Sequence, residues 1–386
     1  MEEKKPKNIL VVNGVLHGHF TGTVEIVREL VSLGHNVTCY VLDEFEDRVK
    51  DIGAKLVVYS IDKSDFNKLP SHLPPNAINS FIFLRSIEAL FNLLPKDENK
   101  YDYYIFDSFF DVKEMNKIFK FNLSNYILIC TAFIFTDVDF SVDIRHRNRL
   151  IKPINVKYNL NLDDYVNIHY IPNKFKKLIL TSKYFHLRAE NTDDTCFFIG
   201  PYIEKRKIDE NFKFEKDKNK KLIYISLGTL FYKNYDLYLK CKEAFQNSEE
   251  YQIIMSVGKS IDIKKLGDIP KNISVYTYVP QLQLLPDVDV FITHGGLNST
   301  QEALLSGLPL IVVPQINDQF DNGKRIEELG AGILLDKNKI DVDVLKNAVN
   351  EIICNKEKYK KGIDKIAESL KEARNNRKSV YEKVFI

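Results

Sequence analysis

The residues best suited to chemistry follow a strand that is expected near position 290. Residues 288–293 are mostly β-branched or aromatic, which predicts a strand, and a His-Gly-Gly run at 294–296 comes directly after it. A helix is expected over 299–306, because glycine and proline at 307 and 309 would end it. The N–H groups and the positive dipole at the start of such a helix form a site for an anion.

Side-chain donors gather at the same junction: His294, Asn298, Ser299 and Thr300. Together they would suit a phosphate or a diphosphate. A simpler alternative is a capping box in which Ser299 and Glu302 satisfy the helix start. The capping box leaves the His-Gly-Gly run unexplained, as well as the acid–amide pair Asp318-Gln319 after the next expected strand, 310–313.

The whole stretch 278–319 resembles the donor-binding signature of UDP-dependent glycosyltransferases with the two-domain GT-B fold. It is most similar to the bacterial macrolide-type glycosyltransferases. The resemblance is carried by three motifs at the family's spacing: Tyr278-Val-Pro-Gln281, His294-Gly-Gly-Leu-Asn-Ser-Thr-Gln-Glu302 and Asp318-Gln319.

The resemblance implies a role for each of these positions. Tyr278, which stands where plant members have tryptophan, would lie over the uracil, and Gln281 would lie close to the nucleoside. The remaining contacts would be to the diphosphate, the ribose and the sugar: His294, Gly296, Asn298 and Ser299 to the diphosphate, Glu302 to the ribose hydroxyls, and Asp318 and Gln319 to the sugar hydroxyls. Because glutamine at the last position is associated with glucose donors in the family, the expected donor is UDP-glucose.

The resemblance also implies a catalytic pair in the first half of the chain. His19, in the run His17-Gly18-His19 after the first expected strand, would be the general base, and imidazole has a suitable pKa for that task. A carboxylate on its other nitrogen would fix the tautomer. Asp107, at the end of the strand expected over 103–106, matches the family's partner position, with Asp111 as the competing candidate.

Two simpler interpretations stand beside this pair. Histidines in an arbitrary loop often have no role, and an aspartate at a strand end is often a helix N-cap. The chain also departs from its relatives at Gly22, where they commonly have proline, so a more mobile acceptor loop is expected there. The first helix is expected to begin only at Thr23.

A metal site is not expected. Asp-x-Asp pairs occur at 137–139, 287–289 and 341–343, but none follows a strand; the second pair precedes a strand, and the third should cap a helix. The helix dipole, His294 and the hydroxyl groups would supply the positive character that the leaving UDP needs. Thr229, in the Ser226-Leu-Gly228-Thr229 loop, would close over the diphosphate by the same resemblance. The UDP-sugar is then a co-substrate, and no cofactor is expected.

Strand-like runs alternate with amphipathic helical runs, which indicates an α/β fold with parallel sheets. Each half begins with a strand running into a glycine-containing loop, so two Rossmann-like, doubly wound domains facing across a cleft (GT-B) are predicted. The expected boundaries are an acceptor-binding domain at 1–203, a linker at 204–221, a nucleotide-sugar-binding domain at 222–370, and a C-terminal helix at 371–386 that packs back on the first domain.

Composition and charge limit the classes of partner and the cellular compartment that we expect. A net charge of +2 in 386 residues, with both signs interspersed, argues against a nucleic acid partner. Five scattered cysteines without metal-ligand spacing are typical of reduced thiols in a cytosolic protein. No secretory signal is apparent, and no apolar run reaches the ~18–20 residues of a spanning helix. We therefore expect a soluble cytoplasmic protein without an integral membrane segment.

The favoured function is an inverting, metal-independent transfer of glucose to a hydroxyl of an apolar small molecule, of macrolide or phenolic type. The acceptor class rests on residues 79–94 and 132–140, which are rich in phenylalanine, leucine and isoleucine and line the acceptor pocket in the family, although ordinary helix core explains them too. One alternative is a membrane-surface lipid glycosyltransferase, with 174–179 as its only basic apolar segment. Another is a nucleotide-sugar-binding protein without turnover. Liposome co-sedimentation would distinguish the lipid glycosyltransferase from the favoured function. Acceptor-dependent release of UDP would distinguish an enzyme from the binding protein.

Overall fold

The chain forms two compact units in a computed structural model. The structure describes residues 5–61, 75–94, 100–108, 110, 112–134, 152, 154–161, 175–203, 209–228, 234–259, 261–316 and 318–385. The first unit comprises Met1–Ser182, Arg188–Tyr202 and Ala373–Ile386, and the second comprises Lys183–Leu187 and Ile203–Glu372.

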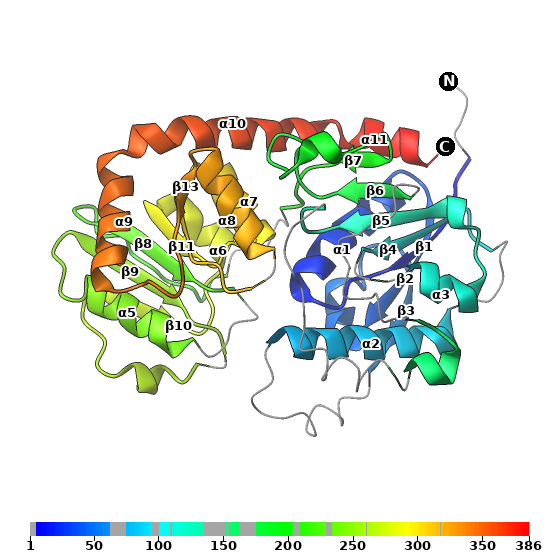
Figure 1. Cartoon of the computed structure of the whole chain (residues 1–386), viewed down its shortest axis with the longest axis horizontal. Coiled ribbons are helices and arrows are strands. Elements are labelled where there is room, and N and C mark those ends of the chain that lie inside the picture. The colour runs from blue at the N-terminus through cyan, green and yellow to red at the C-terminus, as the bar shows by residue number, and fades with distance from the viewer. Residues whose placement is uncertain are drawn as a thin grey trace. The chain divides into compact units, whose positions relative to one another are not determined.

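The first unit is built on a parallel sheet of seven strands in the order β3-β2-β1-β4-β5-β6-β7 (Figure 1). Its strands are β1 (Asn8–Val12), β2 (Asn36–Leu42), β3 (Lys55–Tyr59), β4 (Tyr103–Asp107), β5 (Tyr126–Cys130), β6 (Lys176–Ile179) and β7 (Cys196–Phe198). Leu10, Ile105 and Ile127 on the three central strands are fully buried, as expected where helices cover both faces.

The strand β6 starts two residues before the predicted one, because Lys176 and Lys177 masked its apolar pattern. Lys177 is buried and donates from Nζ to Phe175 O (2.9 Å) and Thr195 Oγ1 (2.7 Å). A lysine held in this way is part of the sheet. The described residues of the segment 174–179 therefore do not form the basic membrane-facing surface considered above.

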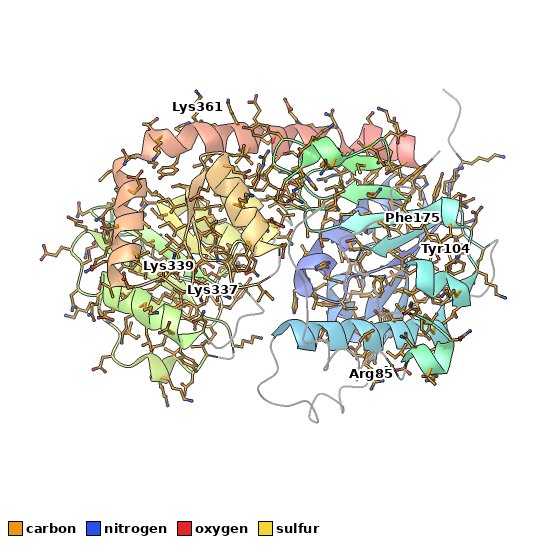
Figure 2. The ribbon with its side chains drawn as sticks, viewed as in Figure 1. Arg85, Tyr104, Phe175, Lys337, Lys339 and Lys361 are labelled. Carbon is orange, nitrogen blue, oxygen red and sulfur yellow. The ribbon has the colours of Figure 1, made fainter. Side chains whose placement is uncertain are left out.

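The helices α1 (His17–Ser32), α2 (Pro75–Leu93) and α3 (Val112–Phe119) accompany this sheet, with α2 and α3 next to each other (Figure 1), and a C-terminal helix described below also belongs to the first unit. Short 3-10 turns lie at Asp43–Arg48 (η1), Leu123–Asn125 (η3) and Ala189–Asn191 (η5). Aromatic rings fill part of the core, where Tyr104 stacks on Phe121 with centroids 4.1 Å apart and Phe175 reaches Tyr126 (Figure 2).

The start of α1 corrects two expectations. The helix begins at His17 and not at Thr23, so the two histidines lie in its first turn and not in a loop. Gly22 lies inside the helix and is buried, and a Cβ added there would meet Leu180 Cδ2 at 2.2 Å. Gly22 is therefore a packing contact, and the mobile loop expected at this position is not present.

The second unit has a six-stranded parallel sheet in the order β10-β9-β8-β11-β12-β13. Its strands are β8 (Lys221–Ser226), β9 (Tyr251–Ser256), β10 (Ile273–Tyr276), β11 (Val290–Thr293), β12 (Leu310–Val312) and β13 (Gly332–Leu334). The edge strand β13 was not predicted, because it begins at a glycine and has only two apolar residues.

Helices cover both faces of the second sheet. They are α5 (Tyr235–Phe245), α6 (Gln281–Leu284), α7 (Leu297–Leu305), α8 (Gln319–Glu328) and α9 (Val342–Cys354), with 3-10 turns at Ile263–Leu266 (η6) and Leu285–Asp287 (η7). Figure 1 shows α7 and α8 on one side and α5 packed with α9 on the other. Because β8, β11 and β12 run parallel, they end at the same edge of the sheet. The candidate donor-binding loops start from that edge.

Two helices end the chain, α10 (Lys356–Asn375) and α11 (Arg377–Val384). Along α10, Ile363, Ile366 and Leu370 are buried, whereas Lys361 projects outward (Figure 2). None of the helices in the described ranges is long and apolar enough to cross a lipid bilayer.

The last helix is held in the first unit by a buried arginine. Arg377 donates to Ile199 O (2.9 Å) and Pro201 O (3.0 Å), and its guanidinium lies 3.6 Å from the centroid of the Tyr202 ring. The hydroxyl of Tyr202 also lies 2.6 Å from that of Tyr381 on α11. Polar contacts therefore supplement the apolar packing of α11 against the rest of the first unit.

Candidate functional site

His19 and Asp107 meet in the first unit, although 88 residues separate them in the sequence. Nδ1 of His19 lies 2.9 Å from Oδ2 of Asp107, which is completely buried at the end of β4, whereas the His19 side chain is 14% exposed. Because a carboxylate only accepts hydrogen bonds, Nδ1 carries the hydrogen. Nε2 then has the lone pair, which is the arrangement required of a general base.

Thr131 joins this pair and was missed in the sequence. It follows β5, and its hydroxyl lies 2.7 Å from Nδ1 and 3.4 Å from Nε2 of His19. Its position could have been inferred, because β4 and β5 are neighbours and their carboxyl ends meet at one edge of the sheet. The threonine hydroxyl therefore adds a third polar group at the imidazole.

A glycine lets the pair approach. A Cβ on Gly14, between β1 and α1, would lie 2.4 Å from Cβ of His19 and 2.7 Å from Oδ2 of Asp107. Because both contacts are shorter than van der Waals distance, only glycine fits without moving the pair. The absence of a side chain at Gly14 is therefore what lets His19 and Asp107 come this close.

His17 faces other partners. Its ring lies edge-on to Phe45 with centroids 5.0 Å apart, and burial lowers its pKa, against the raising effect of Glu44. Asp111, the competing partner for His19, lies outside the described residues.

In the second unit, His294 is enclosed by two glycines. A Cβ on Gly228 would come within 2.6 Å of the His294 ring, and one on Gly296 within 2.5 Å. Burial lowers the pKa of His294 to about 4, opposed by a hydrogen bond with the Ser226 backbone. The imidazole is therefore neutral at ordinary pH, so any positive character at this junction comes from dipoles and not from a charged ring. A neutral ring has one N–H, which is the group that bonds to the Ser226 backbone.

The helix α7 begins at Leu297, two residues earlier than predicted, with Gly296 as its N-cap residue. Glycine provides no capping side chain, and Ser299 is already the third helical residue, so the capping box considered above is not formed. The N–H groups of residues 297–299 precede the first intrahelical bond, from Thr300 N to Gly296 O (3.0 Å). Asn298 and Ser299 thus lie in the first turn, as a diphosphate site requires.

Two of the predicted nucleoside contacts bind each other. Nε2 of Gln281 donates to Oε2 of Glu302 over 2.7 Å, and both side chains are largely buried. The amide therefore orients the Glu302 carboxylate. Tyr278 is 55% exposed, an unusual state for a large aromatic ring.

The predicted sugar contacts lie at the start of α8. Asp318 is the N-cap residue, and Oε1 of Gln319 accepts from the backbone N–H groups of Gln315 (2.9 Å) and Ile316 (3.2 Å). The amide oxygen of Gln319 is therefore used within its own turn. Only its NH₂ group is available to donate to a ligand.

The Asp-x-Asp pairs within the described ranges have structural partners. Asp289 accepts from Leu222 N (3.0 Å) and pairs with Lys216 (3.1 Å), and Asp341 caps α9 through Val344 N (2.8 Å). Over the described part of the chain, no group of three or more His, Cys, Asp or Glu side chains is placed to hold a metal ion. Asp137 and Asp139 lie outside that part, as does Thr229.

The expected acceptor segments are only partly described. In α2, Leu84, Ile87 and Leu90 are buried in the core of the first unit. Beside them, a cavity of about 280 Å³ has a mainly polar lining that includes Arg85, which extends from α2 (Figure 2), and Lys157. The described face of α2 therefore supports core packing more than an apolar pocket, and residues 135–140 lie outside the described ranges.

Comparison with known proteins was made for both sequence and structure. Residues 249–378 match the family described as erythromycin biosynthesis protein CIII-like, C-terminal domain. The NDP-glycosyltransferase YjiC of Bacillus subtilis (strain 168) is 31% identical over 92% of this chain and 91% of its own length. An uncharacterized UDP-glucosyltransferase, YdhE, from the same organism is 29% identical over 95% of each chain. The crystal structure of the glycosyltransferase of kitacinnamycin superposes with a TM-score of 0.75 at 23% identity, covering 98% of this chain and 99% of that one, which shows a shared fold.

Proposed function

Because the chain belongs to the macrolide-type bacterial glycosyltransferases of the GT-B fold, we propose that it transfers glucose from UDP-glucose to a hydroxyl of an apolar small molecule. Transfer inverts the anomeric centre and requires no metal ion. The observation that carries this proposal is the contact between His19 and the buried carboxylate of Asp107.

The reaction begins with proton removal. Nε2 of His19 takes the proton of the acceptor hydroxyl as the oxygen attacks the anomeric carbon from the face opposite UDP. The imidazolium that forms is stabilised by Asp107, whose carboxylate is buried and already bound to Nδ1. One displacement on the face opposite the leaving group inverts the configuration.

The donor is held by the second unit. Glu302, oriented by Gln281, binds the ribose hydroxyls, and the first turn of α7 binds the diphosphate with its N–H groups. Asp318 accepts hydrogen bonds from sugar hydroxyls, whereas Gln319 donates one. The name of the relative YdhE supports UDP-glucose as the donor.

Departure of UDP needs stabilisation of the charge that develops on the diphosphate. Here the N–H groups at the start of α7 supply preorganised dipoles, and His294, bonded to the Ser226 backbone, packs against Gly296 at that start. We infer that these dipoles replace the divalent cation that other glycosyltransferase folds use.

A panel assay tests the proposal directly. The protein is incubated with UDP-glucose or UDP-galactose and a mixture of phenols and macrolides, and the products are read by mass spectrometry. Glucosides are expected from at least one acceptor. Products from UDP-galactose alone would contradict the assigned donor, and UDP release without any acceptor product would favour hydrolysis over transfer.

A further inference from the structure

A buried asparagine connects the loop before α7 with the start of α8. Asn322 is completely buried, and its Nδ2 donates to Gly295 O over 2.8 Å and to Asp318 Oδ2 over 3.1 Å. Gly295 belongs to the loop that leads into the diphosphate-binding turn, and Asp318 is a proposed sugar contact. One amide group therefore contacts both halves of the donor site.

The orientation of this amide is determined by its surroundings. Both neighbours are oxygen atoms, so an amide turned by 180° would place Oδ1 against two acceptors. A buried amide without partners is costly, whereas one that donates to a carboxylate gains a charge-assisted bond. The backbone N–H of Asn322 also bonds to Asp318 O (2.9 Å), which sets the side chain in the first turn of α8.

The loop at Gly295 is tightly packed against the same turn. Gly295 has φ +85°, and a Cβ there would meet Val312 Cγ1 at 2.6 Å and Gln319 O at 3.3 Å. Its N–H also donates to Thr293 Oγ1 (3.3 Å). Several contacts thus hold the backbone of the loop.

We propose that Asn322 is a positioning residue that fixes the Asp318 carboxylate relative to the diphosphate loop, and so sets where the sugar lies. This inference rests on the proposed function of Asp318. Asn322 itself is too deeply buried to touch the sugar. Its effect should therefore appear in the binding of UDP-glucose but much less in that of UDP, which has no sugar.

Calorimetry on the full chain with Asn322→Ala tests this. The Kd for UDP-glucose should rise about tenfold, the size expected for losing a hydrogen bond to a charged group, while the Kd for UDP changes less than about threefold. In an Asp318→Ala background, Asn322→Ala should change the ratio of the two Kd values no further, because the group through which it acts is already absent.

A matched control exists in the same unit. Asn272 also donates from Nδ2 to two oxygens, Phe245 O (2.8 Å) and Tyr251 O (3.2 Å), but it touches neither loop. Asn272→Ala should leave the Kd ratio unchanged. Should Asn322→Ala fail to fold, Asn322→Ser gives the same test, since its hydroxyl can bond to the helix carbonyl four residues back.

The possible results separate cleanly. An unchanged ratio in the Asn322 variant, or a change that persists in the Asp318→Ala background, would overturn the positioning role alone. Wild-type protein that binds neither UDP nor UDP-glucose would overturn the proposed function, and this inference with it.

Discussion

A single ring nitrogen of His19 determines how this residue can act. Nδ1 lies 2.9 Å from the Asp107 carboxylate, which can only accept, so the basic lone pair is directed to Nε2. The Thr131 hydroxyl lies 2.7 Å from the same Nδ1. The buried carboxylate opposes any rotation of the ring that would break this contact. At the scale of residues, therefore, the tautomer follows from the neighbours and not from imidazole itself.

Removing the base gives the first prediction. His19→Ala should lower the transfer rate about a hundredfold or more, the usual scale for losing a general base. UDP-glucose binding, measured by calorimetry, should hardly change, because His19 belongs to the first unit and the proposed donor contacts to the second. A variant that transfers glucose at the wild-type rate would remove His19 from the mechanism.

The second prediction separates ribose from sugar contacts. Glu302→Ala should weaken UDP and UDP-glucose alike, because both contain ribose. Asp318→Ala should weaken UDP-glucose and leave UDP nearly unaffected. Equal losses for both ligands in the Asp318 variant would refute its contact with the sugar.

At the scale of elements, the site depends on how strands pass into helices. The β1–α1 junction brings Gly14 under His19, and the β11–α7 junction places Gly296 at the helix start and against His294. Each junction uses a glycine where a side chain would displace a functional imidazole. The two strand–helix junctions therefore determine where the imidazoles of His19 and His294 lie.

The β1–α1 junction gives the third prediction. Gly14→Ala would place a methyl group 2.4 Å from Cβ of His19, so the ring must move away from Asp107. We expect transfer to fall about tenfold or more, since misplacement by about 1 Å is that harmful to catalysis. UDP binding by calorimetry serves as the control. Wild-type activity in Gly14→Ala would show that α1 accommodates the methyl group without displacing His19, and would contradict this prediction.

The helix start in the second unit gives the fourth prediction. If the start of α7 stabilises the leaving UDP, then EDTA should not reduce transfer. His294→Ala removes the ring that packs against Gly228 and Gly296, and it should lower the transfer rate about tenfold or more, since displacement of the helix start by about 1 Å is that harmful to catalysis. Initial rates with and without EDTA measure the first effect. Loss of product on chelation, reversed by Mn²⁺ or Mg²⁺, would show that a metal participates.

The strands and helices were predicted more closely than the site. The bounds of β1, β3, β5 and β10 agree with the strands expected from their apolar residues, at 8–12, 55–59, 126–130 and 273–276. Thr131 and Asn322 were not recognised: Thr131 shows only its place directly after an expected strand, and nothing near Asn322 in the sequence distinguishes it from other polar residues. Their roles arise from partners brought close by neighbouring strands or by packing between helices.

At the scale of the whole molecule, buried histidines link stability to pH. His186 is fully buried in the second unit, and burial lowers its pKa to about 4, from 6.5 in an exposed chain. Between these values the unfolded chain binds more protons than the folded one. The stabilisation is therefore complete above pH 6.5 and is lost as the pH falls towards 4.

This linkage gives the fifth prediction. The shift corresponds to ~3 kcal/mol of unfolding free energy lost by about pH 4, and His294, whose pKa is lowered to the same value, should add a similar amount. Urea unfolding at pH 7.5 and pH 5 samples the upper part of this range, so each histidine should account for ~2 kcal/mol of the difference. His186→Gln should show a smaller difference between the two pH values. Wild-type protein that is equally stable at both would contradict a neutral buried histidine.

The sequence by itself determined the parallel α/β architecture and the chemical types available at each strand end, because hydrophobic periodicity and motif spacing are local properties of the chain. The tertiary structure alone decided which of those groups meet. It joined Thr131 to His19 across 112 residues and Asn322 to Gly295 across 27. It also made His294 neutral, because protonation depends on the surrounding dielectric and partners, which only the packed structure supplies.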